Sequence, residues 1–367
     1  MTKTATAGPK TDARTAEREH FLNLTPGKLS GLRHVTDGGH RFRVLALDQS
    51  NSFKKALRKM HERAGKPAEP SYEEIRDAKL AMVTALGPEA SAVLLDVNFG
   101  ARQALNSLAL PREAGLIVRL EASKEAGLPS DYEPGWSVEK IKRMGAAAVK
   151  LLVYLDTEDP ANVKPQMAFV ERVSRECAAA DILLMTEELS FPRKGEEKSS
   201  PSYKARKVKN IVEATRLIGP YTDILKLEFP GFMGEESASA VQERLALLNE
   251  TAIRPWVLLS AGEKFDLFVK QTELAMKAGA SGYMAGRAIF NEYFEQDTPQ
   301  KRELFLAKEA TARIRALNRI VDENAAPWIR RESIASRDLA ARVSPDWYGD
   351  GKARRAPEPV ASSSAEY

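Results

Sequence analysis

The chain has 367 residues, of which 43% are hydrophobic and 29% charged, so it can form one large soluble domain or two medium ones. Its 55 lysines and arginines nearly balance its 51 aspartates and glutamates and are dispersed along the chain, which argues against a nucleic-acid partner. Cys177 is the single cysteine, no apolar run reaches the roughly 18 residues of a membrane span, and the start MTKTATAGPK lacks the apolar centre of a signal peptide. We therefore expect a cytoplasmic protein without a membrane partner.

Two tails and one domain are predicted. Residues 1–20 are polar without sustained periodicity, and residues 331–367 end in GDGKARRAPEPVASSSAEY, a composition that cannot offset the entropy of ordering. We expect both tails to be disordered. No linker rich in proline, glycine or serine divides residues 21–330, so these are expected to form a single domain.

Within this domain, short apolar runs alternate with longer amphipathic stretches. The near-continuous apolarity of the short runs is typical of parallel strands that are covered on both faces. The expected strands are 43–48, 91–96, 115–120, 147–153, 181–186, 223–228, 255–260 and 281–285; the expected helices are 72–86, 137–144, 166–179, 205–217, 238–249, 264–278 and 301–321.

Eight strands, each followed by a helical stretch or by room for one, predict a (β/α)8 barrel, the TIM-barrel fold. An open doubly wound sheet is the alternative. It would want a glycine-rich turn after the first strand, whereas the turn here is Asp48-Gln49-Ser50. The sequence therefore favours the barrel and lacks a dinucleotide-binding fingerprint.

The four histidines, His20, His34, His40 and His61, all lie in the first 61 residues. Zinc sites and Ser-His-Asp or Cys-His catalysis require imidazoles, so both are excluded unless these four converge. We expect no metal and no cofactor, and chemistry based on lysine, aspartate, glutamate, arginine or tyrosine.

Polar residues cluster where the expected strands end, and in a barrel the carboxyl ends of the strands form the active site. The residues at these ends are Asp48, Gln49, Asp96, Glu121, Lys150, Glu187, Glu188, Lys226, Glu228, Ser260, Gly262, Gly286 and Arg287.

Two lysines lie inside apolar strands, Lys150 in VKLLV and Lys226 in ILKLEF. Each ammonium must be paired with a carboxylate, or have its pKa lowered by burial and by a nearby cation. A neutral amine can attack a ketone or aldehyde to form a Schiff base. The alternative for either lysine is a purely structural ion pair with Asp96 or Glu187. Two such lysines in one barrel favour the catalytic interpretation.

The turns after strands 7 and 8, SAGEKFD and AGRAIFNEY, resemble barrel phosphate sites, where glycines expose backbone N–H groups. Ser260, Gly262 and Gly286 would provide the turn, and Arg287 could grip phosphate in two places. Glycines at these places can also serve only to turn the chain. Their joint occurrence predicts a phosphorylated small-molecule substrate.

Schiff-base chemistry also needs a group that moves protons. Glu187 follows LLMT at the predicted end of strand 5, between the two lysine strands, and is the best-placed candidate. Asp48 is a second candidate, and Asp96 could hold a lysine or a substrate hydroxyl. Any of these carboxylates could instead cap the next helix.

Together these segments resemble the class I tagatose-1,6-bisphosphate aldolase family, and also the sulfofructose-1-phosphate aldolases. The resemblance runs from about residue 29 to Trp328 and covers neither tail. It implies a metal-independent (β/α)8 lyase that splits a ketose bisphosphate into dihydroxyacetone phosphate and glyceraldehyde 3-phosphate. The matching segments are LALDQS, SAVLLDVNFG, WSVEKIKRMGAAAVKLLVYLD, LLMTEELSF, DILKLEFP, LLSAGEKFDLF and GASGYMAGRAIF.

The resemblance also assigns roles. Lys226 would form the Schiff base, Lys150 would favour the neutral form of that amine and contact the substrate, and Glu187 would be the proton shuttle. Asp48 and Gln49 would bind substrate hydroxyls or orient the lysines. The phosphate of the dihydroxyacetone half would be held by Ser260, Gly262, Gly286 and Arg287. Metal-dependent aldolases need imidazoles at several strand ends, and strands 2 to 8 supply none.

One departure concerns the far end of the substrate. The family commonly continues Asp-Gln with arginine, whereas this chain has Ser50-Asn51. A cation that would bind a second phosphate or a sulfonate is thus absent at that position. Arg193 and Lys194, in the loop LSFPRKGEEKSS, are candidate replacements.

Other functions remain open at this point. A transaldolase or a sulfosugar aldolase would use the same lysine. A sugar-phosphate isomerase or epimerase would use carboxylates for proton transfer and Lys226 only as an electrostatic partner. A non-catalytic phosphosugar sensor would bind ligand and turn over nothing. The sequence leaves the oligomeric state open, and a homo-oligomer is compatible with it.

Overall fold

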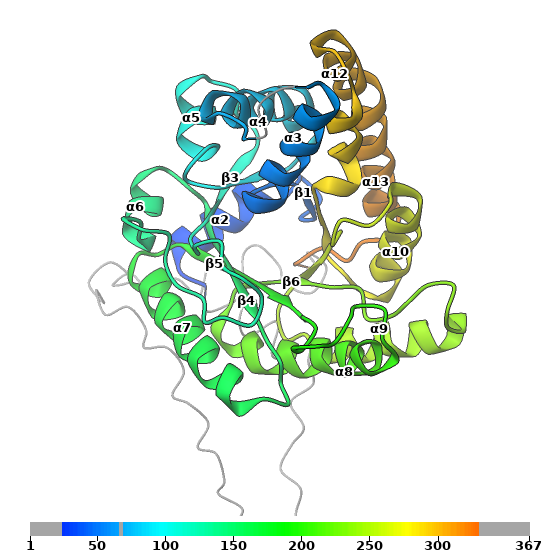
Figure 1. Cartoon of the computed structure of the whole chain (residues 1–367). Helices are drawn as coiled ribbons and strands as arrows, with labels where there is room; N and C mark the ends of the chain where they lie inside the picture. Colours follow the sequence, from blue (N-terminus) through cyan, green and yellow to red (C-terminus); the bar gives the residue numbers. More distant parts are fainter. Residues whose placement is uncertain (1–23, 66–68, 330–367) are drawn as a thin grey trace, which may run out of the picture.

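The computed structural model describes residues 24–65 and 69–329 (Figure 1), so the predicted tails 1–20 and 331–367 lie outside the described residues. Eight parallel strands close into a barrel in chain order, with β8 pairing with β1. This confirms the predicted (β/α)8 fold. The strands are β1 (Phe42–Leu47), β2 (Ala92–Leu95), β3 (Gly115–Arg119), β4 (Ala148–Tyr154), β5 (Leu183–Leu189), β6 (Ile224–Leu227), β7 (Trp256–Leu259) and β8 (Gly282–Ala285).

Helices surround the barrel on its outside (Figure 1). Their ends follow familiar local signals. A capping box between Ser71 and Glu74 begins α4, Asp159 caps α7 ahead of Pro160, and Gly279 ends α10 in a left-handed conformation with φ of 119°. The helices are α2 (Pro26–Val35), α3 (Asn51–Arg63), α4 (Tyr72–Leu86), α5 (Ala101–Asn106), α6 (Val138–Arg143), α7 (Pro160–Ala179), α8 (Pro201–Ile218), α9 (Ala238–Thr251), α10 (Phe265–Ala278), α11 (Arg287–Phe290), α12 (Pro299–Phe305) and α13 (Thr311–Asn324).

Some boundaries differ from the prediction. The helix expected at 301–321 is interrupted by a π-helical turn, Leu306–Ala310, that separates α12 from α13. Strand β5 starts two residues later than expected and continues through Glu187 and Glu188, because β4 extends to Tyr154 and pairs with it over its whole length. Glu187 therefore lies within a strand, and its expected place after the strand was wrong.

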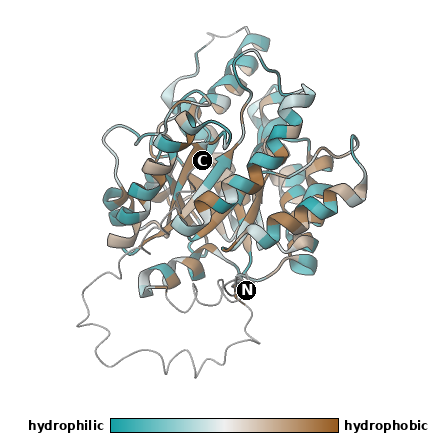
Figure 2. Ribbon diagram, turned by 90° about the horizontal axis from the view of Figure 1, so that it is seen from below, coloured by the Kyte–Doolittle hydropathy of each residue, from teal (hydrophilic) through white to brown (hydrophobic). Residues whose placement is uncertain are grey.

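Apolar side chains fill the amino-terminal part of the barrel interior. Helix α2 and Trp328 close the amino-terminal end, where Leu32 and Val35 join the inward-facing residues of all eight strands. A larger apolar cluster fills the space between the strands and the outer helices. Figure 2 shows the same separation, with hydrophobic residues on the central strands and hydrophilic ones on the outer faces of the helices. Among the described helices, none is long and apolar enough to cross a membrane.

A polar layer lies next to the apolar interior, toward the carboxyl ends of the strands. Side chains alternate along a strand, so the residue two positions beyond an inward-facing residue also faces inward. Interior residues Ala46, Ile117, Ala148, Met185 and Ile224 are thus followed by charged ones. The charged side chains of this layer are those of Asp48, Arg119, Lys150, Glu187 and Lys226, and all five are buried.

Candidate active site

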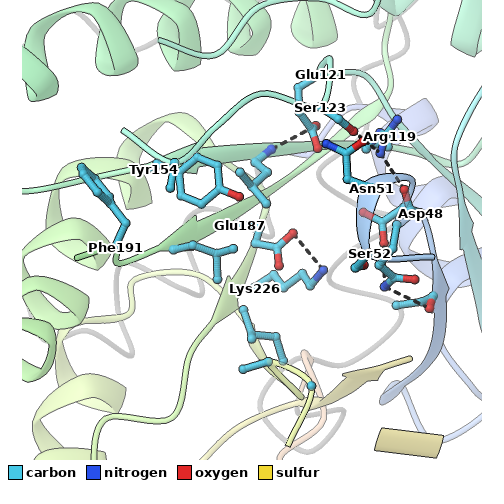
Figure 3. Close-up of a pocket in the computed structure, with 18 of the residues that line it drawn as sticks. Asp48, Asn51, Ser52, Arg119, Glu121, Ser123, Tyr154, Glu187, Phe191 and Lys226 are labelled. Carbon is cyan, nitrogen blue, oxygen red and sulfur yellow. Dashed lines mark hydrogen bonds and ion pairs between the residues drawn. The ribbon is translucent and has the colours of Figure 1, made fainter. Parts of the chain in front are cut away.

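A cavity of about 410 Å3 opens at the carboxyl end of the barrel (Figure 3). Glu187 and Lys226 lie at its centre, Asp48 and Arg119 on one side, and Tyr154 and Phe191 on the other. Nine of the ten residues that the sequence predicts for the site line this cavity: Asp48, Gln49, Lys150, Glu187, Lys226, Ser260, Gly262, Gly286 and Arg287.

Ion pairs join the two lysines through one carboxylate. Lys150 Nζ lies 2.8 Å from Glu187 Oε2, and Lys226 Nζ lies 2.9 Å from the same oxygen. Lys150 Nζ also lies 3.0 Å from Asp48 Oδ2 and 2.8 Å from Glu121 Oε1. The two ammonium groups are therefore close neighbours, held together by carboxylates that offset their mutual repulsion.

Lys150 is paired with three carboxylates in this arrangement. Its burial acts to lower the pKa, but Asp48, Glu121 and Glu187 outweigh that effect and raise the pKa of Lys150 well above its ordinary value. Lys226, by contrast, contacts one carboxylate among the described residues. Fewer ion pairs must be broken when Lys226 gives up its proton, so it is the lysine better suited to act as a nucleophile.

The two carboxylates beside the lysines are ionised. Burial would raise the pKa of Glu187, but Lys150 and Lys226 together hold it below its ordinary value. Asp48 behaves in the same way: burial acts against Lys150, Lys226 and Arg119, and the net effect lowers its pKa. Both groups can therefore accept a proton at neutral pH.

Two further charged residues of the pocket carried no assigned role in the sequence prediction. Glu121 accepts hydrogen bonds from Lys150 Nζ and from the backbone N–H of Leu152, and burial raises its pKa in spite of Lys150. Arg119 Nη1 donates a 2.6 Å hydrogen bond to the Asp48 carbonyl. The signal for Arg119 was present in GLIVRL, a charged residue within an apolar strand, as for the two lysines.

The turns after β7 and β8 form one wall of the cavity and carry Arg287, a cation without a counter-ion among the described residues. Gly262 has φ of 82°, and a Cβ there would lie 2.9 Å from Cζ of Arg287. A Cβ on Gly286 would lie 2.3 Å from the Ala46 carbonyl oxygen, so both positions require glycine. Arg287 itself forms no ion pair with any residue between 24 and 329 that the structure describes, and its guanidinium is available to an anion.

Comparison with known proteins identifies the family. Residues 44–292 match the DeoC/LacD family of aldolases. The chain belongs to this aldolase family. It is 30% identical over 333 residues to tagatose 1,6-diphosphate aldolase 2 of Streptococcus agalactiae serotype III, covering 84% of this chain and 99% of that protein. It is 29% identical over 326 residues to tagatose 1,6-diphosphate aldolase 1 of Enterococcus faecalis, covering 82% of this chain and 97% of that protein.

Solved structures share the fold at lower sequence identity. An archaeal fructose 1,6-bisphosphate aldolase superposes with a TM-score of 0.53 at 17% identity, covering 81% of this chain and all of that one. Fructose-bisphosphate aldolase from Plasmodium falciparum superposes with a TM-score of 0.58 at 12% identity, covering 82% of this chain and 97% of that one.

Two sequence expectations for this aldolase differ from the structure. Asp96 does not line the cavity; it is fully buried and paired with Lys79 of α4, so of its two expected roles it holds a lysine and not a substrate hydroxyl. Arg193 and Lys194 do not line it either, and Arg193 pairs instead with Asp156 and Glu158. The cations on the lining loops are Lys124 and Lys198. Neither residue followed from the sequence, because loop lysines carry no local signal of direction.

In the described ranges of the aldolase, no group of three or more histidine, cysteine, aspartate or glutamate side chains is arranged to hold a metal ion. Asp48, Glu121 and Glu187 do converge, but the ammonium of Lys150 occupies the point where their oxygens meet.

Proposed function

We propose that the chain is a class I aldolase that cleaves a phosphorylated ketose through a Schiff base on Lys226. The observation that carries this proposal is the sharing of Glu187 Oε2 by Lys226 and by Lys150, which contacts three carboxylates, in the same cavity as the guanidinium of Arg287, which has no ion-pair partner among the described residues. This arrangement supplies a nucleophilic amine, a proton acceptor and an anchor for phosphate.

The phosphate anchor orients the substrate. A phosphate held by Arg287 and the Ser260–Gly262 turn places the dihydroxyacetone half of a ketose 1-phosphate at the β7–β8 side of the cavity. Its ketone carbon then lies toward the lysines of β4 and β6. Holding the ketone beside the amine removes the entropic cost of a bimolecular encounter.

Schiff-base formation begins when Glu187 accepts the proton of Lys226. The neutral amine adds to C2 of the ketose, and the carbinolamine loses its oxygen as water once that oxygen is protonated. Lys150 remains charged throughout, and its positive charge repels a second positive charge on Lys226. The product is an iminium group that can accept electrons.

Cleavage then breaks the bond between C3 and C4. The proton of the C4 hydroxyl passes to a carboxylate, for which Glu187 and Asp48 are both ionised and in the cavity. The electron pair of the C3–C4 bond moves into the iminium group and gives an enamine, while the aldehyde half departs. Protonation of C3 and hydrolysis return the free lysine and the ketone product.

Tagatose 1,6-bisphosphate, giving dihydroxyacetone phosphate and glyceraldehyde 3-phosphate, is the substrate we propose. The cavity is lined by six cationic and four anionic side chains, a positive excess that suits a substrate with two phosphates. Ser50 Oγ is buried there and makes no hydrogen bond to any described residue. With Lys124 and Lys198 it offers contacts to the far phosphate. The similarity to tagatose 1,6-diphosphate aldolases supports the same choice.

Borohydride reduction in the presence of dihydroxyacetone phosphate tests the chemistry. The expected result is one covalent adduct on Lys226, located by peptide mass spectrometry and absent without borohydride. An adduct on another lysine, or no adduct, would contradict the proposal. A cleavage panel of tagatose 1,6-bisphosphate, fructose 1,6-bisphosphate and sulfofructose 1-phosphate then distinguishes the substrates. We expect the largest kcat/KM for tagatose 1,6-bisphosphate, and a transaldolase would instead require an acceptor aldehyde.

A further inference from the structure

Lys79 is a fully buried lysine that lies outside the cavity. It projects from α4 toward the end of β1, and it is absent from the lining of the pocket. Its Nζ donates to the carbonyl of Leu47 at 2.7 Å and to the carbonyl of Gln49 at 3.0 Å, and it pairs with the carboxylate of Asp96. The three N–H donors of the ammonium thus have three acceptors, so the buried charge is fully satisfied.

The carbonyl between those two is held by a second buried cation. Arg119 Nη1 donates to the Asp48 carbonyl at 2.6 Å (Figure 3). Strand β1 ends at Leu47, so beyond that residue the sheet no longer determines the direction of the backbone. Three consecutive carbonyls, those of Leu47, Asp48 and Gln49, are therefore fixed by two buried cations on different elements.

Asp96 is itself held in place. Its Oδ1 accepts the backbone N–H groups of Asn98 at 2.9 Å and Phe99 at 2.7 Å, in the turn after β2. The Lys79–Asp96 pair thereby connects this turn to the turn after β1. Burying an ion pair in a protein interior is seldom the most stable choice, since an apolar pair of similar volume often does as well. The contacts of this pair fix the relative positions of the two turns that it joins.

The geometry in question is that of Asp48. Its carboxylate lies 3.0 Å from Lys150 Nζ, and the side chain of Gln49 reaches back to the Ala46 carbonyl beside Gly286. We infer that Lys79, with Asp96, is a positioning residue that acts through the backbone of residues 47–49 to hold Asp48 against Lys150. This inference rests on the proposed function, because its main measurement is the cleavage rate.

A mutant cycle tests it. Lys79→Met combined with Asp96→Asn removes the pair without leaving a buried charge unpaired, and the asparagine keeps an oxygen for the N–H groups of Asn98 and Phe99. We expect kcat to fall about 10- to 100-fold with little change in KM, because the substrate's phosphate contacts are intact. In an Asp48→Asn background the same pair of substitutions should cost less than about 3-fold, since the side chain that it positions is already disabled.

The matched control is Lys28→Met with Asp223→Asn. This pair joins α2 to the start of β6 at the opposite end of the barrel, with a 2.8 Å contact. We expect it to lower the urea midpoint of unfolding but to leave kcat unchanged. If the Lys79 and Asp96 substitutions reduce kcat by the same factor with and without Asp48→Asn, or change only the unfolding midpoint, the inference is wrong. Failure of the proposed function shows separately, as the absence of a borohydride adduct on Lys226 in the unmodified protein.

Discussion

On the β3–β6 side of the barrel mouth, Lys150 and Lys226 are joined to Glu187 and its neighbouring carboxylates by short ion pairs, whereas on the β7–β8 side Arg287 has a glycine turn beside it and no described partner. One side satisfies its own charges before any substrate enters. The other leaves a cation to be satisfied by the substrate.

This contrast follows the chemistry required on each side. Groups that move protons must be held at fixed distances and fixed charge states, which mutual ion pairs achieve. A group that only binds an anion gains most when nothing has to be displaced from it first. We therefore expect substitutions on the first side to act mainly on kcat and those on the second mainly on KM.

The largest effect is expected at Lys226. Lys226→Arg keeps a positive charge against Glu187 but cannot form an imine, so kcat should fall at least about 1,000-fold and borohydride trapping should disappear. The matched control is Lys277→Arg, an exposed lysine of α10. Substantial remaining activity in Lys226→Arg would instead favour a sugar-phosphate isomerase or epimerase, in which the charge alone is needed.

Glu187→Gln should give the next largest effect. The amide keeps the shape of the side chain but cannot accept a proton from Lys226, so we expect kcat to fall about 100- to 1,000-fold with KM changed less than about 3-fold. Rapid-quench measurement of the cleavage step would show this directly. A large rise in KM with kcat unaltered would mean that Glu187 serves binding instead of proton transfer.

Arg287→Ala tests the β7–β8 side of the cavity. Loss of the guanidinium should raise KM for the sugar phosphate about 10- to 100-fold and reduce kcat less than about 10-fold, with the phosphate turn otherwise intact. Inorganic phosphate should inhibit the unmodified protein competitively and the variant far more weakly. Arg315→Ala, at an exposed ion pair with Glu89, is the control and should behave like the unmodified protein. Equal inhibition of both proteins by phosphate would place the anchor elsewhere.

The sequence was sufficient for the barrel and for most of the pocket, because both depend on local patterns. Near-continuous apolar runs define the strands, and the carboxyl ends of parallel strands together form the mouth of the barrel, where charged residues in or after these runs can gather. Lys150, Lys226 and Asp48 were found in this way. Arg119 carries the same signal and could have been assigned with them.

What the sequence could not provide is the choice of partners. Lys79 lies in the segment YEEIRDAKLAMVTAL, and a single lysine in an amphipathic helix is expected to be exposed to solvent. In the structure it is fully buried and paired with Asp96. From its place after a strand, Asp96 could be expected to hold either a lysine or a substrate hydroxyl, and the sequence does not identify Lys79 as its partner. Arg193, a candidate with Lys194 for binding the far phosphate, is likewise paired with Asp156 at 2.6 Å. These ion pairs join elements that are distant in the chain, and the spacing of hydrophobic residues along the sequence does not predict such pairs.

The smallest effect on activity is expected at Glu188, the neighbour of Glu187 on β5. Unlike Glu187, it does not line the cavity, and burial together with Glu228 raises its pKa to about 8. The folded protein therefore holds a proton on Glu188 that the unfolded chain releases above its ordinary pKa of 4.5. Glu188 therefore makes the folded protein progressively less stable, relative to the unfolded chain, as the pH rises from 4.5 to about 8.

Glu188→Gln mimics the protonated carboxyl. The amide oxygen can still accept from Ser190 and Asn210, as Oε1 does now. In urea unfolding, we expect the variant and the unmodified protein to be equally stable at low pH and the variant to be more stable above pH 8, by about 1–2 kcal/mol, with kcat unchanged. Glu243→Gln, an exposed position on α9, should produce no such pH-dependent difference. If the stability of the variant relative to the unmodified protein instead increased as the pH fell, Glu188 would be ionised in the folded protein, as Glu187 is, and the prediction would be wrong.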